Sequence, residues 1–399
     1  MRIAVFTDSY RPYTSGVVRS IETCRHELEA RGHQVFIFAP RYNWGRYGEE
    51  RAGEKRVFRF CAFPTPNKTG FSLAIPLSIH LRQDLRRLGV DLVHVHSPFL
   101  LGRLGARAAR DLGLPLVFTH HTLYDQYVHY FPVARKLTRQ VTQRLAVGFC
   151  NRCDVVLVPT RVIGDYIREL GVTSPIKDLP TGIRIEDFSG GDRKWLRQRF
   201  GIADDEKVLL FVGRMGLEKN VDFLLRAFQL VRASHPGLPL RLVLVGGGPE
   251  MDNFQRLAAT LGIAEHTLFA GPVAPEKMGD CYAGADLFVF ASVTETQGLV
   301  IGEAKAAGLP AVAVRAFGVS EMVTDGEDGF LTPEDEAAFA EKVGRLVTED
   351  ELYRRFAAAA RANAARLSAQ ALTDRLLGIY RALLDERALS PQGRGRKSS

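Results

Sequence analysis

The chain has 399 residues, of which 46% are hydrophobic and 25% are charged, as in a globular protein of two or at most three domains; a disordered, collagen-like or coiled-coil chain is excluded. No apolar run approaches the ~20 residues of a membrane span, the first residues do not read as a signal peptide, and five cysteines are too few for a disulfide framework. A cytoplasmic protein is therefore expected.

The net charge of +8 is unevenly distributed. Residues 1–190 hold 27 Lys and Arg against 17 Asp and Glu, whereas residues 191–399 hold 26 against 28. Such an asymmetry indicates that the first half faces something anionic, for which nucleic acid, a phospholipid surface and an acidic small molecule are candidates. A solvated basic surface with no partner is the alternative.

In the first half, short apolar runs alternate with helical stretches, which predicts βαβ units and a parallel sheet. The predicted strands are 2–6, 33–40, 91–96, 114–120 and 154–159, and the predicted helices include 17–31 and 132–150. Residues 41–70 lack periodicity and are predicted to be irregular.

The pattern restarts with a strand at 207–215 and continues through strands at 240–245, 266–273, 285–292 and 309–314. The predicted fold class is α/β, with two Rossmann-like parallel-sheet domains that face each other across a cleft. The predicted domains are an acceptor domain over 1–190, a donor domain over 191–370, a C-terminal helix over 371–390 that can pack back on the first domain, and a disordered tail over 391–399.

The segment ETQGLVIGEAKAAGLP (295–310) is the most informative in the chain. Glu295 follows a predicted strand, Gln297 and Gly298 open a helix, and Glu303 lies further along that helix. The free amides and positive dipole end of a helix N-terminus bind phosphate, and glycine lets a ligand approach the backbone. Two carboxylates on either side of such a site suit the sugar and the ribose of a nucleotide-sugar; two solvated glutamates on a surface helix are the alternative.

A second segment, GRMGLEKN (213–220), follows the first strand of the second half. Arg214 and Lys219 would lie at the C-terminal end of that strand, where a diphosphate would bind. Two cations there would stabilise the charge that develops on a leaving diphosphate. The alternative is an exposed basic loop without a ligand.

With these two segments, the sequence resembles the GT-B glycosyltransferases of family 4, which are retaining and use nucleotide-sugars. The family's paired glutamates match Glu295 and Glu303, its Gly-Arg…Lys element matches Gly213, Arg214 and Lys219, and the likeness extends from a loop ending at Gly16 to the last helices. The segments HVHSPFLLG (94–102) and THHTLYDQY (119–127) resemble family members that glycosylate diacylglycerol and similar lipids.

The resemblance implies roles for single residues. His121, Glu295, Arg214 and Lys219 would be catalytic, and His96 and Tyr124 would contact the acceptor. The residues implied in donor binding are Gly16, Gly213, Arg214, Lys219, Val273, Glu295, Gln297, Gly298, Leu299 and Glu303. The sequence departs from the family at Arg184, where an acidic residue is usual.

Rival sites carry less signal. His94, His96, His120, His121 and His129 cluster at predicted strand ends, but no Cys or Asp partner has the spacing of a zinc site. Cys150 and Cys153 form a CxxC that ends a helix, unlike a redox motif. No Asp-x-Asp occurs in the chain, so we expect no metal and no other cofactor, the nucleotide-sugar being a substrate.

The stretch 134–149 carries Leu137, Val141 and Leu145 at four-residue spacing, with Lys136, Arg139 and Arg144 around them. This pattern fits a core-facing helix with a solvated basic face, and it equally fits an interfacial membrane helix. The three basic residues are therefore candidates for contact with an anionic membrane.

The expected function is transfer of a hexosyl group, glucosyl from UDP-glucose, to a lipid such as diacylglycerol by a protein at the inner face of the cell membrane. Its expected partners are the nucleotide-sugar, the lipid acceptor and an anionic membrane surface, without nucleic acid. One alternative keeps the fold with a soluble sugar or sugar-phosphate acceptor. The other is a non-enzymatic Rossmann protein that binds nucleic acid through its basic half.

Overall fold

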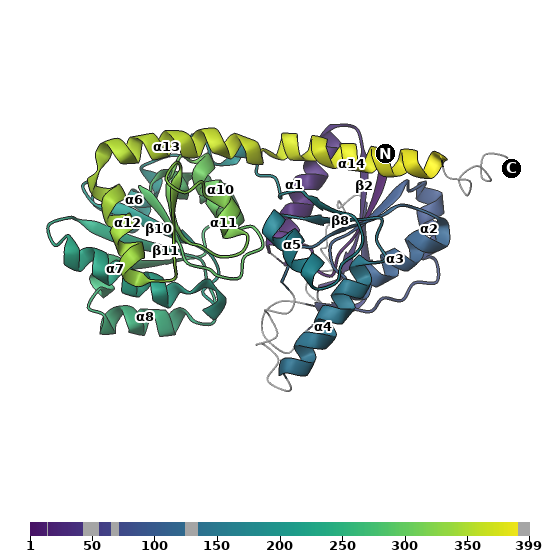
Figure 1. Ribbon diagram of the computed structural model, residues 1–399, viewed down its shortest axis with the longest axis horizontal. Coiled ribbons are helices and arrows are strands. Elements are labelled where there is room, and N and C mark those ends of the chain that lie inside the picture. The colour runs from purple at the N-terminus through teal and green to yellow at the C-terminus, as the bar shows by residue number, and fades with distance from the viewer. Residues whose placement is uncertain (14, 43–55, 65–71, 124–134, 390–399) are drawn as a thin grey trace. The chain divides into compact units, whose positions relative to one another are not determined.

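A computed structural model describes residues 1–13, 15–42, 56–64, 72–123 and 135–389, except for the side chains of residues 64 and 135–139. The chain forms two compact units, of which unit 1 comprises Met1–Gly182 with Ala369–Ser399 and unit 2 comprises Ile183–Ser368 (Figure 1). Each unit is a parallel sheet covered by helices, and the predicted α/β class with two Rossmann-like domains is confirmed. The predicted tail, 391–399, lies outside the described residues.

The sheet of unit 1 has seven parallel strands in the order β3-β2-β1-β6-β7-β8-β9. Its strands are β1 (Arg2–Phe6), β2 (Gln34–Pro40), β3 (Val57–Phe60), β6 (Leu92–Val95), β7 (Leu116–Thr119), β8 (Val155–Val158) and β9 (Ile176–Asp178). Its helices are α1 (Gly16–Ala30), α2 (Leu81–Leu88), α3 (Leu100–Leu112), α4 (Arg135–Cys150), α5 (Arg161–Glu169) and α14 (Ala369–Leu389). The central strands are buried along their whole length, as near-continuous apolar runs require when helices cover both faces.

The prediction of an irregular segment over 41–70 is wrong for residues 57–64. Strand β3 pairs with β2, placing Val57 opposite Ile37, and the rings of Phe38 and Phe58 stack at 4.8 Å between centroids. Strand β4 (Ala62–Pro64) then pairs antiparallel with β5 (Ser72–Ala74). These strands are too short to show periodicity, and pairing with distant segments determines them.

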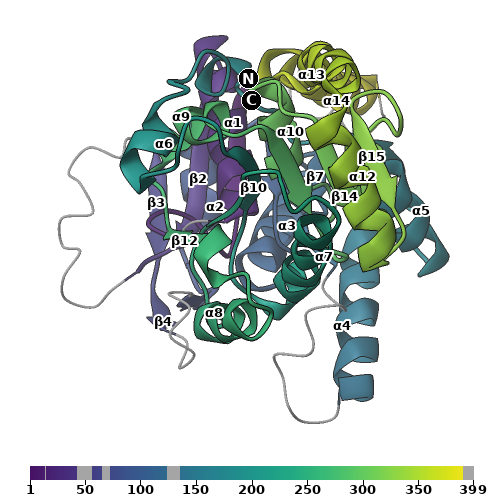
Figure 2. The same cartoon turned by 90° about the vertical axis from the view of Figure 1, so that its left-hand side faces the viewer.

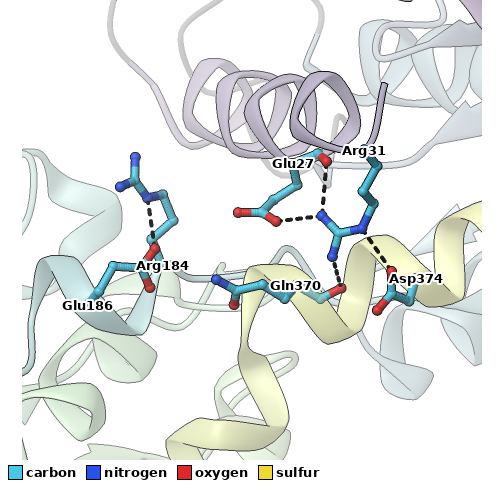
Figure 3. A network of polar contacts seen from close by, with 6 residues as sticks. All are labelled: Glu27, Arg31, Arg184, Glu186, Gln370 and Asp374. Carbon is cyan, nitrogen blue, oxygen red and sulfur yellow. Dashed lines mark hydrogen bonds and ion pairs between the residues drawn. The ribbon is translucent and has the colours of Figure 1, made fainter. Parts of the chain in front are cut away.

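The C-terminal helix α14 belongs to unit 1. Figure 3 shows Arg31 at the end of α1 bridging to it: Nε donates to Asp374 at 2.9 Å and Nη2 donates to the carbonyl of Gln370 at 3.1 Å. Arg31 also pairs with Glu27 at 2.7 Å on its own helix. One guanidinium thereby ties the two helices together.

The chain passes from unit 1 to unit 2 between Gly182 and Ile183, not at residue 190 as the sequence suggested. Ile183 forms a β-bridge with Ser368 and, like Phe188, is buried in the core of unit 2. Arg184, at the position that is usually acidic in family 4, donates to Glu186 at 3.3 Å (Figure 3) and also pairs with Asp187 at 3.3 Å. Neighbouring carboxylates thus neutralise its charge.

The sheet of unit 2 has six parallel strands in the order β12-β11-β10-β13-β14-β15. Its strands are β10 (Lys207–Val212), β11 (Leu240–Val245), β12 (Thr267–Gly271), β13 (Leu287–Phe290), β14 (Ala311–Val314) and β15 (Gly329–Thr332). Its helices are α6 (Trp195–Phe200), α7 (Val221–Ser234), α8 (Met251–Thr260), α9 (Met278–Ala283), α10 (Leu299–Ala306), α11 (Val319–Met322), α12 (Glu336–Thr348) and α13 (Asp350–Ala364). Figure 2 shows α7 beside α12, where the rings of Phe223 and Phe339 meet edge to face at 5.4 Å.

The strand order of each unit reverses beside its first strand. In unit 2, β11 and β12 lie on one side of β10, whereas β13 lies on the other; in unit 1, β2 and β6 flank β1 in the same way. At such a reversal the loops that leave two neighbouring strands diverge and open a crevice at the carboxyl edge of the sheet. Ligand-binding residues are therefore expected in the loops after β10 and β13 of unit 2, and in those after β1 and β6 of unit 1.

Candidate functional site

In unit 2, the loops after β10 and β13 carry the cations and the first glutamate predicted from the sequence. Residues 213–220 follow β10, residues 291–298 follow β13, and the two strands are hydrogen-bonded neighbours. Lys219 forms an ion pair with Glu295, and both side chains are about four-fifths buried. Two of the predicted catalytic residues, 76 positions apart in the chain, are thus in direct contact.

A second contact joins the same two loops. The hydroxyl of Ser292 donates to the carbonyl of Glu218 at 3.0 Å, and both residues are buried. Glu218 lies in a short 3-10 turn, η3 (Leu217–Lys219), which carries the lysine. Sequence reasoning missed Ser292 and Glu218, whose contact depends on the strand order.

Gly213 packs closely against Gly246, where the loops after β10 and β11 meet. Its amide donates to the Val245 carbonyl at 2.9 Å, and a Cβ on Gly246 would lie 1.9 Å from the Gly213 carbonyl oxygen. Arg214 leaves this packed turn with an exposed side chain. The glycines therefore fix the backbone from which the Arg214 guanidinium extends.

Gly318 packs against the loop that leads into α10. The Gly318 amide donates to the Glu295 carbonyl at 3.0 Å, and a Cβ at Gly318 would lie 2.0 Å from the Thr296 carbonyl oxygen. Gly298 precedes the helix with φ of +85°, a conformation that side-chain-bearing residues rarely adopt. The loop that carries Glu295 thus turns sharply into the helix N-terminus, where Leu299 is the first residue.

Glu303 lies on the same helix but in a different environment from Glu295. Its carboxylate is buried, and the hydroxyl of Tyr282 donates to it at 2.8 Å. Gln297 is also buried, and Val273 follows β12 at the same edge of the sheet. The donor residues predicted in this half therefore lie in the loops that follow β10, β12 and β13 or on α10.

Thr294, beside Glu295, holds a further polar atom. Its hydroxyl oxygen is buried and has no hydrogen-bond partner among the residues that the structure describes. Buried hydroxyls are nearly always hydrogen-bonded in native proteins. A polar ligand at this loop would satisfy it.

In unit 1, the corresponding loops carry a chain of histidines. His96, directly after β6, shares a hydrogen bond of 2.7 Å between its Nδ1 and Nε2 of His121, and the two rings stack at 5.0 Å. His94 is bonded through Nδ1 to the Tyr380 hydroxyl at 2.6 Å and through Nε2 to the Thr119 hydroxyl at 2.7 Å. His121, predicted to be catalytic, and His96, predicted to contact the acceptor, are thus brought together, whereas Tyr124 and His129 lie outside the described residues.

Burial makes these histidines neutral at physiological pH. Desolvation, and then the neighbouring His121, lowers the pKa of His94 to about 3. Desolvation, followed by His120, lowers that of His121 to about 3, and the pKa of His96 falls well below its usual value for the same reason. A neutral imidazole can orient a hydroxyl group by hydrogen bonding, but it lacks the additional, acidic proton of the imidazolium that a general acid would donate.

Asp8 joins the loops after β1 and β6, and sequence reasoning missed this contact. Its buried carboxylate accepts from the Ser97 hydroxyl and, at 2.8 Å, from the Leu101 amide at the start of α3. Burial raises the pKa of Asp8, and the two hydrogen bonds oppose that effect. Gly16, the predicted donor residue of this unit, is the first residue of α1 and is exposed.

The two cysteines of the CxxC motif, Cys150 and Cys153, are buried, and desolvation raises the pKa of both thiols. A raised thiol pKa is unsuitable for redox chemistry. Among the described residues, no group of three or more His, Cys, Asp or Glu side chains could hold a metal ion. In that part of the chain, no helix is both long and apolar enough to cross a membrane.

Two parallel-sheet units, each with polar loops at the reversal of its strand order, define the GT-B class of glycosyltransferase. Residues 14–187 match the family model described as Glycosyltransferase Family 4, and residues 192–363 match that of Glycosyl transferases group 1. The chain belongs to these glycosyltransferases, as its motifs suggested.

Similar proteins act on different acceptors. The chain is 33% identical over 339 residues to a protein of Streptococcus pneumoniae named alpha-monoglucosyldiacylglycerol synthase, with 83% of this chain and 75% of that protein covered. It is 33% identical over 313 residues to a D-inositol 3-phosphate glycosyltransferase of Acidothermus cellulolyticus, with coverages of 74% and 68%. A crystal structure of Anabaena Alr3699/HepE in complex with UDP-glucose matches with a TM-score of 0.76 at 22% identity, with coverages of 96% and 100%.

The neutral state of His94 predicts a pH-dependent stability. Because the pKa is about 3 in the folded protein and ~6.5 in the unfolded chain, the unfolded chain binds the extra proton between these values. Stability should be complete above pH ~6.5 and fall as the pH is lowered, by about 1 kcal/mol for this residue at pH ~5.5. Urea unfolding at both pH values should show a smaller loss in His94→Gln than in the wild type. The exposed His26→Gln is the control, and an equal effect in both variants would contradict the assignment.

Proposed function

We propose that the protein transfers a hexosyl group, glucosyl from UDP-glucose, to a membrane lipid such as diacylglycerol, with retention of the anomeric configuration. The observation that supports a nucleotide-sugar donor is the ion pair between Lys219 and Glu295, at the reversal of strand order in unit 2. It places a cation and a carboxylate beside the N-terminus of α10. That combination suits a group that carries phosphates on one side and hydroxyls on the other.

In this proposal, Arg214 and Lys219 bind the diphosphate and stabilise the negative charge that develops as the glycosidic bond breaks. Glu295 accepts hydrogen bonds from the sugar hydroxyls and stabilises the positive charge of the oxocarbenium-like sugar. Because Lys219 and Glu295 already neutralise each other, the donor enters a site whose charges are held in place before it binds. The leaving phosphate oxygen takes the proton of the acceptor hydroxyl on the same face of the sugar.

The remaining donor residues have binding roles. Glu303 accepts from the ribose hydroxyls, with Tyr282 holding its carboxylate, and Gln297 to Leu299 supply the turn and amides of α10. Val273 lines the base side of the site. In unit 1, Gly16 lets the donor approach the start of α1, and neutral His121, held by His96, positions the sugar.

A lipid acceptor is supported by the charge of unit 1. Because α14 and the C-terminal tail belong to it, this unit holds 32 Lys and Arg against 18 Asp and Glu, a net charge of +14, whereas unit 2 holds 21 against 27, a net charge of −6. A domain of this charge is attracted to anionic lipid headgroups. The name of the Streptococcus pneumoniae relative points to the same acceptor.

Helix α4 supplies a second observation, because it projects from the rest of unit 1 (Figure 1). Val141 and Leu145, which a core-facing helix would bury, are 44% and 41% exposed, and Arg144 is exposed beside them. The side chains of Leu137, Lys136 and Arg139 lie outside the described residues. Exposed apolar residues next to a cation are typical of a helix that lies in a membrane interface.

A soluble acceptor is the second candidate, favoured by the likeness to the D-inositol 3-phosphate glycosyltransferase. Membership of the glycosyltransferases sets aside the non-enzymatic nucleic-acid-binding alternative. The donor chemistry is the same for both acceptors, so an acceptor assay must separate them.

The first test follows sugar transfer directly. Radiolabelled UDP-glucose and diacylglycerol in mixed vesicles should give UDP release and label that partitions into organic solvent, and GDP-mannose should give less. Turnover only with inositol phosphate, with the label staying in water, would replace the lipid acceptor by the soluble one.

Metal independence is tested with EDTA. Because Arg214, Lys219 and the helix amides bind the diphosphate in this proposal, activity should persist in EDTA. Complete loss of activity that Mg²⁺ restores would overturn metal independence.

The second test concerns the two cations. Arg214→Ala and Lys219→Ala should each lower kcat by roughly 10²–10³, the size of effect seen when one transition-state donor is removed. The matched control is Lys342→Ala, a lysine on α12 that pairs with its neighbour Glu341 and should leave turnover unchanged. Normal turnover in both site variants would mean that the diphosphate binds elsewhere.

The third test concerns membrane binding by α4. Replacing Lys136, Arg139 and Arg144 with Gln should weaken binding to anionic vesicles roughly 100-fold, because each cation near the surface contributes about 1 kcal/mol. High salt should reverse the binding of the wild type. Replacing Arg82, Arg86 and Arg87 on α2 removes the same charge elsewhere in unit 1 and serves as the control. If the two triple variants lose binding equally, general charge and not α4 holds the protein at the surface.

A further inference from the structure

Unit 2 contains a cavity at the opposite edge of its sheet from the predicted donor residues. A cavity of about 390 Å³ lies among the loop 188–193, the segment 283–285 before β13, the turn 307–309 before β14, and α13. It therefore lies at the amino ends of β13 and β14, whereas Glu295 and Lys219 lie at the carboxyl edge of the same sheet. Its volume is within the range of small-molecule sites.

The cavity is lined by three arginines and no acidic residue. Arg193 comes from the loop before α6, and Arg354 and Arg361 come from α13, two turns apart. None of the three forms an ion pair with a carboxylate in the part of the chain that the structure describes. The neighbouring Arg197 differs in this respect, because it pairs with Asp286 at 3.1 Å. We propose that this cavity, lined by Arg193, Arg354 and Arg361, is an anion site that binds a phosphate-bearing group.

The backbone around the cavity lets the guanidinium groups and a ligand come close. Gly308 has φ of +85°, and a Cβ there would lie 2.1 Å from Nη1 of Arg361, so glycine allows this side chain to lie over the turn. Gly190 has φ of +88°, and a Cβ there would meet nothing within 4 Å, which leaves open space at the rim. Neither glycine is needed by the donor site.

Tyr353 adds a hydroxyl group to the lining. Burial is the main factor that raises the pKa of its phenol, with Asp286 adding to it, and Arg193 and Arg361 act in the opposite direction. The two guanidiniums therefore lie within electrostatic range of the same hydroxyl. The cavity lining thus combines three cations with a neutral hydroxyl group and contains no carboxylate.

A phosphomonoester or diphosphate fits this chemistry best. The planar guanidinium donates two parallel hydrogen bonds to phosphate oxygens, and several arginines together neutralise a dianion. Such a group occurs on soluble phosphorylated metabolites and on the headgroup of phosphatidic acid. The two sources share the chemistry and differ in whether binding requires a vesicle.

The test measures binding of inorganic pyrophosphate by calorimetry and binding to phosphatidylcholine vesicles with and without phosphatidic acid. The double variant Arg354→Gln/Arg361→Gln should weaken the binding at least ~10-fold, as expected when charge-assisted hydrogen bonds are lost. The double variant Arg355→Gln/Arg366→Gln removes the same charge from exposed positions outside the cavity lining and should bind as the wild type does. Circular dichroism checks that both variants are folded.

Lys219→Ala distinguishes this site from the donor site. Pyrophosphate binding that survives Lys219→Ala and is lost in Arg354→Gln/Arg361→Gln supports a soluble ligand, and a loss seen only with phosphatidic acid vesicles supports the lipid headgroup. Binding that Lys219→Ala abolishes and the arginine variant retains would overturn the anion site while leaving the proposed function intact. Equal binding by both double variants, or no binding of either probe to the wild type, would also overturn it.

Discussion

The reversal of strand order beside β10 is the constraint on which the proposed donor site of this protein depends. It places β13 next to β10, so that loops separated by more than seventy residues leave the sheet side by side. The pair of Lys219 and Glu295 and the contact of Ser292 with Glu218 both span this gap. Without that strand order, the cation and the carboxylate would lie on unrelated surfaces. The site is thus a property of topology first and of side chains second.

The same constraint in unit 1 leads to a different chemistry. The loops after β1 and β6 are joined by Asp8 and Ser97, and the strand ends carry stacked, neutral histidines instead of an ion pair. Tyr380 on α14 completes the hydrogen bonding of His94, so that the last described helix of the chain supports a network built on β6 and β7, the fourth and fifth strands of the sheet order. At the strand reversal, unit 2 therefore holds an ion pair between loops, whereas the strand ends of unit 1 hold neutral imidazoles.

The sequence predicted the strands and helices that are long or strongly apolar, because the burial of such segments leaves a periodic signal. It also predicted that Glu295, Lys219 and Arg214 follow strands, which the structure shows. It could not predict β3, β4 and β5, which are short and depend on pairing with distant residues. Nor could it predict Gly318 behind Thr296 or Tyr282 on Glu303, because a long-range contact of a single glycine or tyrosine leaves no local pattern. The boundary at Ile183 was missed for the same reason, since its bridge to Ser368 joins segments far apart in the chain.

Charge is separated in this protein at two levels. Unit 1 is strongly basic, and unit 2 is acidic overall. The diphosphate proposed for unit 2 requires a local concentration of cations, because the average field of an acidic domain repels such a ligand. At the carboxyl edge this is achieved by Lys219 with Arg214, and one of these cations is already paired with Glu295. At the amino edge, Arg193, Arg354 and Arg361 line a cavity whose lining contains no carboxylate.

The two groups of cations differ in how their charge is stabilised before a ligand binds. A cation that is already paired costs less free energy to keep buried, whereas arginines without a carboxylate partner at an open rim remain hydrated until an anion displaces the water. In the two proposals, the edges of one sheet therefore take different ligands: a partly buried one with both hydroxyls and phosphates, and an exposed one recognised by its phosphate alone.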